Sequence, residues 1–261
     1  MPDWTPFPHD ATAYRYDRAG LKRNWSQLHA GDAEALPHDD RVLAAWALFH
    51  AGEFEAAVDA GLRAVQGGAA AGLTVANKAQ ALYAHYLERS EKKKQGLFVE
   101  VAERAGARIA EDPTDASGWY CMAYALGRYG QSISVAKALN QGLGVKVKAA
   151  LETTIRLSPQ HADAHVALGS FHAEVIDKVG SLLGRTQGAS KDAGLAFYRT
   201  ALKLNPRSAI AMVEYANGMV MLEGDRRMKE ATELYQAAAA SEPMDAAERL
   251  DVEIARAELK G

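Results

Sequence analysis

The stretch Leu202-Lys203-Leu204-Asn205-Pro206 is an apolar helical turn that ends in a proline, and it sets the pattern for much of the chain. Proline cannot continue an α-helix and pushes the preceding residue out of the helical region, so each such stretch marks a helix end. Three more stretches have this form and end at Pro113, Pro159 and Pro243. The four prolines are 46, 47 and 37 residues apart. Recurrence at this period predicts stacked helical pairs.

Apolar residues also recur at helical spacing, as in Val42, Ala45, Trp46 and Phe49. The alternation of apolar and polar residues that is typical of strands is almost absent, and residues with high helix propensity are abundant. Pro113, Pro206 and Pro243 are followed within three residues by Asp, Ser or Thr, which commonly cap helices, and Pro159 is followed by Asp163 at the fourth residue. The sequence therefore predicts an all-α chain.

The pattern resembles the tetratricopeptide (TPR) repeat, a helical pair of about 34 residues. Its first unit spans 42–57 and contains the turn Gly52-Glu53-Phe54-Glu55-Ala56-Ala57, which is typical of that family. The resemblance covers 39–243 and implies a right-handed superhelix of about 10–12 helices, with 1–38 and 244–261 as caps. Small residues are expected to let paired helices approach closely. The later units repeat the family positions at Leu168, Gly169, Tyr198, Ala201 and Pro206, and at Gly218, Ala231, Tyr235, Ala238 and Pro243.

Two units are about a dozen residues longer than the repeat, with the surplus in 131–144 and 175–190. Both segments are rich in Gly and Ser yet contain apolar residues, so we expect ordered excursions or helix extensions that pack on the repeats. Such insertions are also similar to two narrower families, the T-component of tripartite (TRAP) transporters and the regulators of microtubule dynamics. The resemblance is carried by 151–206, which includes Ile155-Arg156-Leu157-Ser158-Pro159 and Leu182-Leu183-Gly184. The chain has no lipobox cysteine near residue 1, unlike the first of these families.

Composition excludes several classes of partner. The 261 residues carry a net charge of -3, which gives no reason to expect binding to nucleic acid or to an anionic membrane. The single cysteine, Cys121, rules out an intrachain disulfide and is expected to be buried. No stretch is apolar enough to span a bilayer, and the first residues lack the features of a secretory signal. We therefore expect a cytoplasmic protein without membrane insertion and without a cofactor.

In TPR proteins the first helix of each pair lines a concave groove, and the resemblance implies the same here. Aligned positions four residues apart form one stripe along each first helix. An apolar surface with few polar groups is typical of a ligand or peptide site. The alternative is that the aromatic residues fill the core between helices. The candidate binding residues are Tyr120, Tyr124, Arg128, Ser170, Glu174, Tyr215 and Met219.

A second constellation consists of His161, His165, His172 and Glu174, whose side chains are of the types that bind metals. We favour structural histidines in a helix–helix seam, because the chain has no His-Glu-x-x-His motif and no cysteine pair. The predicted function is a non-catalytic TPR-like scaffold that binds a protein segment or a small amphipathic ligand. A metal-binding protein or metal-dependent enzyme built on the histidines is the alternative. Assembly as a homo-oligomer stays open.

Overall fold

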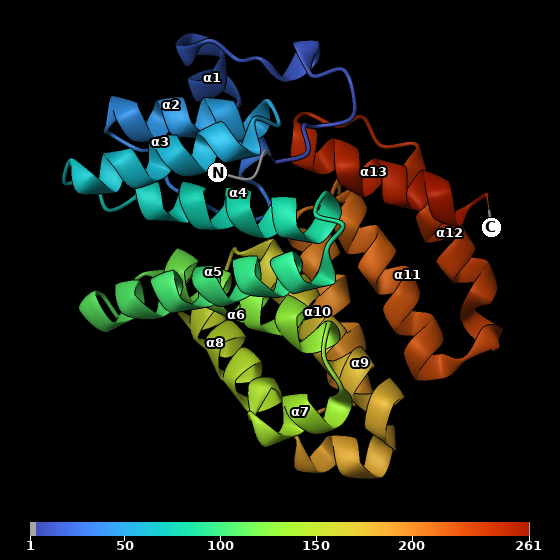
Figure 1. Cartoon of the computed structure of the whole chain (residues 1–261). Coiled ribbons are helices and arrows are strands. Elements are labelled where there is room, and N and C mark those ends of the chain that lie inside the picture. The colour runs from blue at the N-terminus through green and yellow to red at the C-terminus, as the bar shows by residue number, and fades with distance from the viewer. Residues whose placement is uncertain (1–3, 261) are drawn as a thin grey trace. The chain divides into compact units, whose positions relative to one another are not determined.

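The structure is a computed structural model that describes residues 4–260. Within this range the chain forms helices joined by turns, without a strand, which confirms the all-α prediction (Figure 1). The described residues form thirteen α-helices instead of the expected 10–12, and the first insertion contributes one of them. Their bounds are α1 Arg18–Leu28, α2 Asp40–His50, α3 Phe54–Gln66, α4 Gly72–Tyr86, α5 Glu91–Glu111, α6 Ala116–Gln131, α7 Val135–Asn140, α8 Leu143–Leu157, α9 Ala162–Thr186, α10 Lys191–Leu204, α11 Ala209–Glu223, α12 Met228–Ala239 and α13 Ala246–Glu258.

The residues after the prolines begin the next helices, as the sequence predicts. Asp115 caps α6 by accepting a hydrogen bond from the backbone of Gly118, and Ser208 caps α11 in the same way. After Pro159 the capping group is the ring of His161, whose Nδ1 accepts from the backbone of Ala164 at 3.2 Å. Each of these side chains satisfies one of the backbone N–H groups that a helix start leaves without a helical partner.

The chain divides into two compact units, which we describe separately. Unit 1 comprises the chain up to His29, Glu34–Ile133 and Met244–Ala247, and unit 2 comprises Ala30–Ala33, Ser134–Pro243 and the chain from Glu248 onward. Each unit is therefore discontinuous in sequence. The division of the sequence into 1–38, 39–243 and 244–261 stays a prediction.

Helices α2 to α6 form the body of unit 1. Each packs on the next, and α4 also packs on both α2 and α6. This is the arrangement expected of stacked helical pairs, in which α2, α4 and α6 are the first helices. Trp46 and Phe98 lie at the centre with almost no exposed surface. Between α4 and α5, the guanidinium of Arg104 donates to the side chains of Asn77 and Gln80 at 3.0 and 2.6 Å, so these buried polar groups are paired.

The segment Met244–Ala247 completes the core of unit 1. The hydroxyl of Tyr16 donates to the carbonyl of Met244 at 2.8 Å. Nδ1 of His50 lies 2.7 Å from Oδ2 of Asp245, and both side chains are buried. The ring of His50 stacks on Trp46 with centroids 5.7 Å apart. A buried carboxylate and a buried imidazole each need a polar partner, so this contact ties the segment to α2.

In unit 2, α9 packs along α8, α10 and α11. The ring of Tyr198 in α10 is 1% exposed and lies between Gly169 of α9 and Gly218 of α11. A Cβ atom on Gly169 would lie 2.9 Å from the ring, and one on Gly218 would lie 2.4 Å from it. The expectation that small residues allow close approach of the helices is confirmed at both positions.

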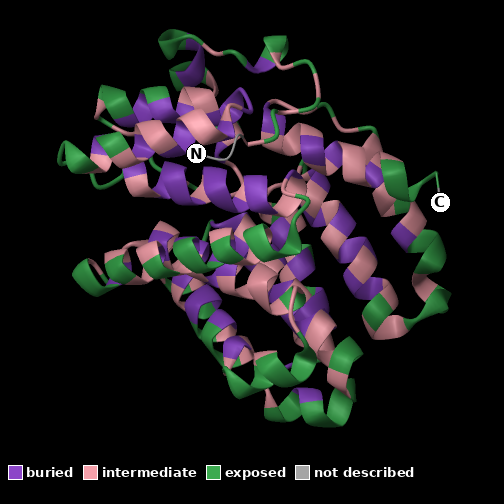
Figure 2. Ribbon diagram, in the orientation of Figure 1, coloured by how far each residue is buried: buried purple, intermediate pink, exposed green. Residues whose placement is uncertain are grey.

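Both insertions are helical in part. Ser134 caps α7, and α9 continues through the second insertion with a break at Gly180, whose φ of 78° and ψ of 162° are conformations open essentially to glycine alone. The expectation that the apolar side chains of these segments pack on the repeats holds for Leu143, which is buried, and is wrong for several others, because α7 is only six residues long and Gly180 breaks α9. Figure 2 shows much of both segments as exposed. The exposed side chains are Val135, Leu139, Leu182 and Leu183.

Candidate functional site

The candidate residues of unit 1 lie on one stripe of α6. Tyr120 is nearly buried, whereas Tyr124 and Arg128 are partly exposed. The guanidinium of Arg128 lies 5.3 Å from the centre of the Tyr124 ring, which is within the range of a cation–π interaction. The rings of Tyr120 and Tyr124 are 6.1 Å apart. The structure thus brings these three side chains together, and two of them reach the surface.

Helix α4 adds two residues to this stripe that the sequence analysis did not identify. Nζ of Lys78 lies 5.6 Å from the centre of the Tyr120 ring, and the ring of His85 lies 6.4 Å from that of Tyr124. Burial lowers the pKa of His85 well below its ordinary value, and the positive charge of Arg128 lowers it further. His85 is therefore neutral at pH 7. We call these five residues, Lys78, His85, Tyr120, Tyr124 and Arg128, the α4–α6 surface.

The α4–α6 surface is aromatic and cationic. Its two charged side chains, Lys78 and Arg128, are both positive, and each lies over a tyrosine ring. Flat aromatic faces bind apolar and planar groups, and a guanidinium on such a face presents fixed N–H donors to a carboxylate. The chemistry of this surface fits a partner that carries acidic and apolar groups together.

The candidate residues of unit 2 have different surroundings. Oγ of Ser170 accepts from the hydroxyl of Tyr198 at 3.1 Å and donates to Oε2 of Glu214 at 2.9 Å. Burial raises the pKa of Tyr198 well above its ordinary value, and the charge of Glu214 adds to the effect. Glu174 pairs with Lys178 at 3.4 Å. Ser170 and Glu174 are partly exposed and belong to an acidic surface on α9.

Tyr215 and Met219 lie in the core of unit 2. Tyr215 is buried and stacks on Tyr198 with ring centroids 5.3 Å apart. Met219 has no exposed surface and packs in the same apolar cluster. A side chain without exposed surface cannot contact a ligand in this structure, so Met219 does not contribute to a binding surface here. Its position on the stripe of α11 predicted that it faces the groove, and in the structure Gly218, the residue before it, lies against the Tyr198 ring.

The four residues that could form a metal site have separate structural roles. His161 caps α9, Nε2 of His165 lies 3.4 Å from the carbonyl of Pro159, and Nδ1 of His172 accepts from the backbone of Ser190 at 3.2 Å. Burial lowers the pKa of both His165 and His172 below the ordinary value. Within 4–260 no three His, Cys, Asp or Glu side chains lie close enough together to hold a metal ion.

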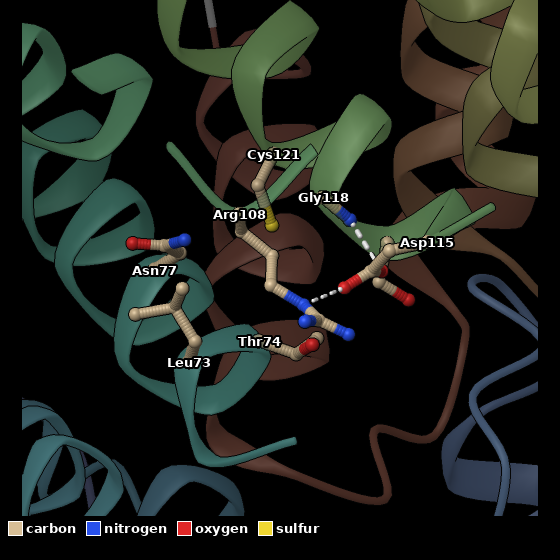
Figure 3. Close-up of a pocket in the computed structure, with 8 residues that line it drawn as sticks. Leu73, Thr74, Asn77, Arg108, Asp115, Gly118 and Cys121 are labelled. Carbon is tan, nitrogen blue, oxygen red and sulfur yellow. Dashed lines mark hydrogen bonds and ion pairs between the residues drawn. The ribbon is translucent and has the colours of Figure 1, made fainter. Parts of the chain in front are cut away.

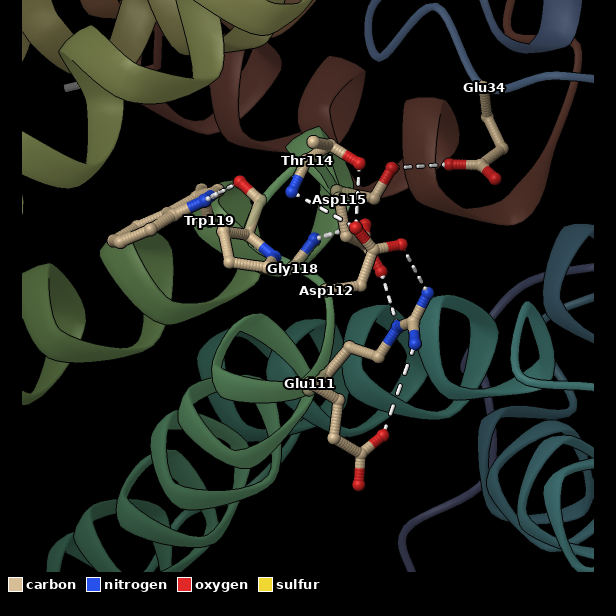
Figure 4. A network of polar contacts seen from close by, with 10 residues as sticks. Glu34, Glu111, Asp112, Thr114, Asp115, Gly118 and Trp119 are labelled. Atoms are coloured by element: carbon tan, nitrogen blue, oxygen red, sulfur yellow. Dashed lines mark hydrogen bonds and ion pairs between the residues drawn. The ribbon is translucent and has the colours of Figure 1, made fainter.

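A small recess lies elsewhere on unit 1, between α4 and the start of α6 (Figure 3). Its wall includes Thr74, Asn77 and Cys121, and one side is formed by Arg108, whose Nε donates to Asp115 at 2.7 Å. Figure 4 shows that this ion pair belongs to a wider network around the α5–α6 turn. The recess leaves almost no room for a ligand, and Arg108 and Asp115 in its wall already bond to each other, so the α4–α6 surface is the better candidate.

The sequence matches no family model and no curated protein. Among solved structures, the fold is similar to that of a thermophilic TPR protein from Thermus thermophilus, with a TM-score of 0.59 and 19% sequence identity. The match covers 84% of this chain and 98% of that one. The chain has a TPR-like fold. The first helices of the TPR-like helical pairs are α2, α4, α6, α9 and α11. The resemblances to the TRAP T-component and to the regulators of microtubule dynamics stay predictions.

No helix within the described range combines the length and the apolar character needed to cross a membrane.

Proposed function

We propose that this TPR-like chain is a non-catalytic binding scaffold that holds a protein segment on the first-helix surfaces of its repeats, in the cytoplasm. The observation that carries the proposal is the pairing of partly exposed Tyr124 with Arg128 on α6. Tyr and Arg are the residue types most enriched where binding energy concentrates in protein interfaces. A small amphipathic ligand with a carboxylate has the same chemistry and is the alternative occupant.

The charge of the α4–α6 surface selects among partners. Lys78 and Arg128 are cationic, and His85 is neutral, so the surface favours a segment with Asp, Glu or a terminal carboxylate beside apolar residues. On unit 2, Ser170 and Glu174 offer an acceptor-rich surface that favours the opposite charge. Tyr215 is buried in the core of unit 2, so we expect a smaller contribution from it. We place the strongest binding on the α4–α6 surface.

A peptide-binding measurement tests the proposal. Peptides selected from a random displayed library on the whole chain are labelled, and their affinities for the Arg128→Glu variant are compared with those for the unchanged chain. Loss of a charge-assisted hydrogen bond costs about 1.5–3 kcal/mol, which corresponds to a roughly 10- to 100-fold weaker Kd. The selected peptides are expected to be rich in acidic residues.

The matched control is Arg199→Glu, the same charge reversal at an exposed position on α10, a second helix. It is expected to leave peptide affinity unchanged. Equal weakening by both reversals would mean that the effect is one of net charge alone, and equal binding to all three proteins would remove the α4–α6 surface as the site. Native mass spectrometry of the purified chain distinguishes a retained small ligand from a peptide. No observation on the described residues favours a metal site built on His161, His165, His172 and Glu174.

A further inference from the structure

The most exposed apolar side chains of the described residues gather in and beside the two insertions of unit 2. Leu182 is 79% exposed, and Leu183 and Val145 are each 59% exposed. Val135 and Leu139 on α7 are exposed as well. Exposed leucines placed singly are ordinary, but five large apolar side chains in two short neighbouring segments form a feature that marks an interaction site.

The two insertions and the residues that follow them are basic. Residues 131–151 and 175–191 contain six Lys or Arg residues and one acidic residue, Asp177. The chain as a whole has a net charge of -3, and these segments contribute +5, so the remainder carries -8. Three of the six cations, Lys148, Lys178 and Lys191, form ion pairs with acidic residues outside the segments. Lys146 and Arg185 are exposed and lie close in sequence to Val145 and the Leu182–Leu183 pair, and Lys137 is an exposed residue of α7.

The fold places the two insertions at one end of α8. Helix α7 ends at Asn140, and α8 begins at Leu143, so the first insertion leads directly into α8. The second insertion returns to the same helix, because a Cβ on Gly188 would lie 3.2 Å from the side chain of Lys148. In Figure 1 α7 and the end of α9 lie at the same end of α8. Basic and apolar side chains from two parts of the sequence thus share one surface.

We propose that the two insertions form a peripheral docking surface for an anionic lipid bilayer. Leu182 and Leu183 project from the broken end of α9 rather than lining a groove, and a projecting apolar side chain fits a deformable apolar medium. Cations beside exposed leucines match the boundary between lipid headgroups and acyl chains, where interfacial segments lie without spanning the membrane. Lys146 and Arg185 face the lipid phosphates in this arrangement.

Charge decides between a bilayer and a second copy of the chain. An interface between two copies of this surface would bring the exposed cations of both into proximity, and like charges across an interface oppose association. An anionic membrane offers the opposite charge over a continuous area. The net charge of the whole chain gave no reason to expect a membrane, because it hides the local excess of cations in these two segments.

Flotation of the whole chain with phospholipid vesicles tests the proposal. The chain is expected to float with vesicles that contain about 30% phosphatidylglycerol, and to stay unbound with phosphatidylcholine alone. Each cation near an anionic surface strengthens binding by about fivefold, so replacing Lys137, Lys146 and Arg185 with Gln should weaken partitioning roughly 100-fold. Leu182→Ser with Leu183→Ser should abolish flotation, and neither change should lower the thermal midpoint, because these side chains are exposed.

The matched control is Met221→Ser with Met228→Ser, which removes two exposed apolar side chains of unit 2 outside the insertions. It should float like the unchanged chain. The proposal is overturned if the chain ignores phosphatidylglycerol vesicles, or if the leucine and methionine variants float equally well. Sedimentation equilibrium gives the competing result: a dimer that the leucine change dissociates, without vesicle binding, would assign the surface to a second copy. Neither outcome bears on the α4–α6 surface.

Discussion

Replacing Gly218 with Ala should destabilise unit 2, although Ala is the better helix former. A Cβ at this position would lie 2.4 Å from Cε2 and 2.6 Å from the hydroxyl oxygen of Tyr198. The ring cannot move away, because its other side faces Gly169, where a Cβ would already lie 2.9 Å from it. Overpacking of a core costs about 1–3 kcal/mol, and this contact belongs at the upper end. The higher helix propensity of Ala stabilises the helix by about 1 kcal/mol, so the free energy of unfolding should fall by about 2 kcal/mol in total.

Urea unfolding followed by far-UV circular dichroism measures this loss. Tryptophan fluorescence does not suit unit 2, since all four tryptophans, at positions 4, 25, 46 and 119, belong to unit 1. The two units can unfold in separate transitions, so the dichroism and fluorescence curves should be compared. The control is Gly106→Ala on α5, where a Cβ meets no atom within 4 Å. That change should stabilise unit 1 by up to about 1 kcal/mol.

A double-mutant cycle with Tyr198→Ala isolates the clash. In that background the ring is gone, so Gly218→Ala should become neutral or stabilising, and the coupling between the two changes should reach about 2–3 kcal/mol. If Gly218→Ala costs the same with and without the ring, the packing argument fails. A stability equal to that of the unchanged chain would likewise show that α10 and α11 separate easily.

Three further changes follow from other contacts. Asp245→Ala removes the partner of buried His50 and should cost about 1–3 kcal/mol, seen as an earlier transition in the fluorescence of Trp46, and no change would mean that the pair contributes nothing. The lowered pKa of His85 means that the unfolded chain takes up a proton below its ordinary pKa of 6.5 that the folded chain refuses, so stability should fall as pH drops through and below this value. His85→Gln should flatten that dependence, and an unchanged pH profile would contradict the assignment. Gly180→Ala should cost about 1–3 kcal/mol in thermal unfolding, because alanine is strained at its φ and ψ, and a gain in stability would show that α9 runs straight.

The sequence predicted the helical pairs best where proline punctuates them. The turns around Pro113 and Pro206 predict both the end of one helix and the cap of the next. In the structure a helix ends before each of these prolines and the next helix is capped after it. The sequence analysis did not identify α4 as a first helix, because no proline precedes it: α3 ends at Gln66 and is followed by glycine residues 67–68. Lys78 and His85 were therefore absent from the candidate site.

Burial within the helices was harder to predict than the helices themselves. Met219 and Tyr124 occupy aligned positions on first helices, yet one is fully buried and the other partly exposed. The difference depends on how closely a neighbouring helix approaches: Gly218, before Met219, admits the Tyr198 ring from α10, whereas the residue before Tyr124 is Ala123. Apolar residues in the insertions were expected to pack, but several are exposed. Periodicity indicates which side chains share a helix face, but it does not indicate whether a neighbouring helix covers that face.

The discontinuity of unit 1 bears on how the chain is made. His50 and Asp245 are 195 residues apart, and ribosomes add about 5–20 residues each second. The imidazole is therefore synthesised roughly 10–40 s before its carboxylate partner. Helices α2 to α6 have time to assemble in that interval, but with a gap where Met244–Ala247 belongs. Completion of the first half of the protein is thus among the last events of its biosynthesis, and a nascent chain that stalls beyond Ile133 displays an open first unit until Asp245 arrives.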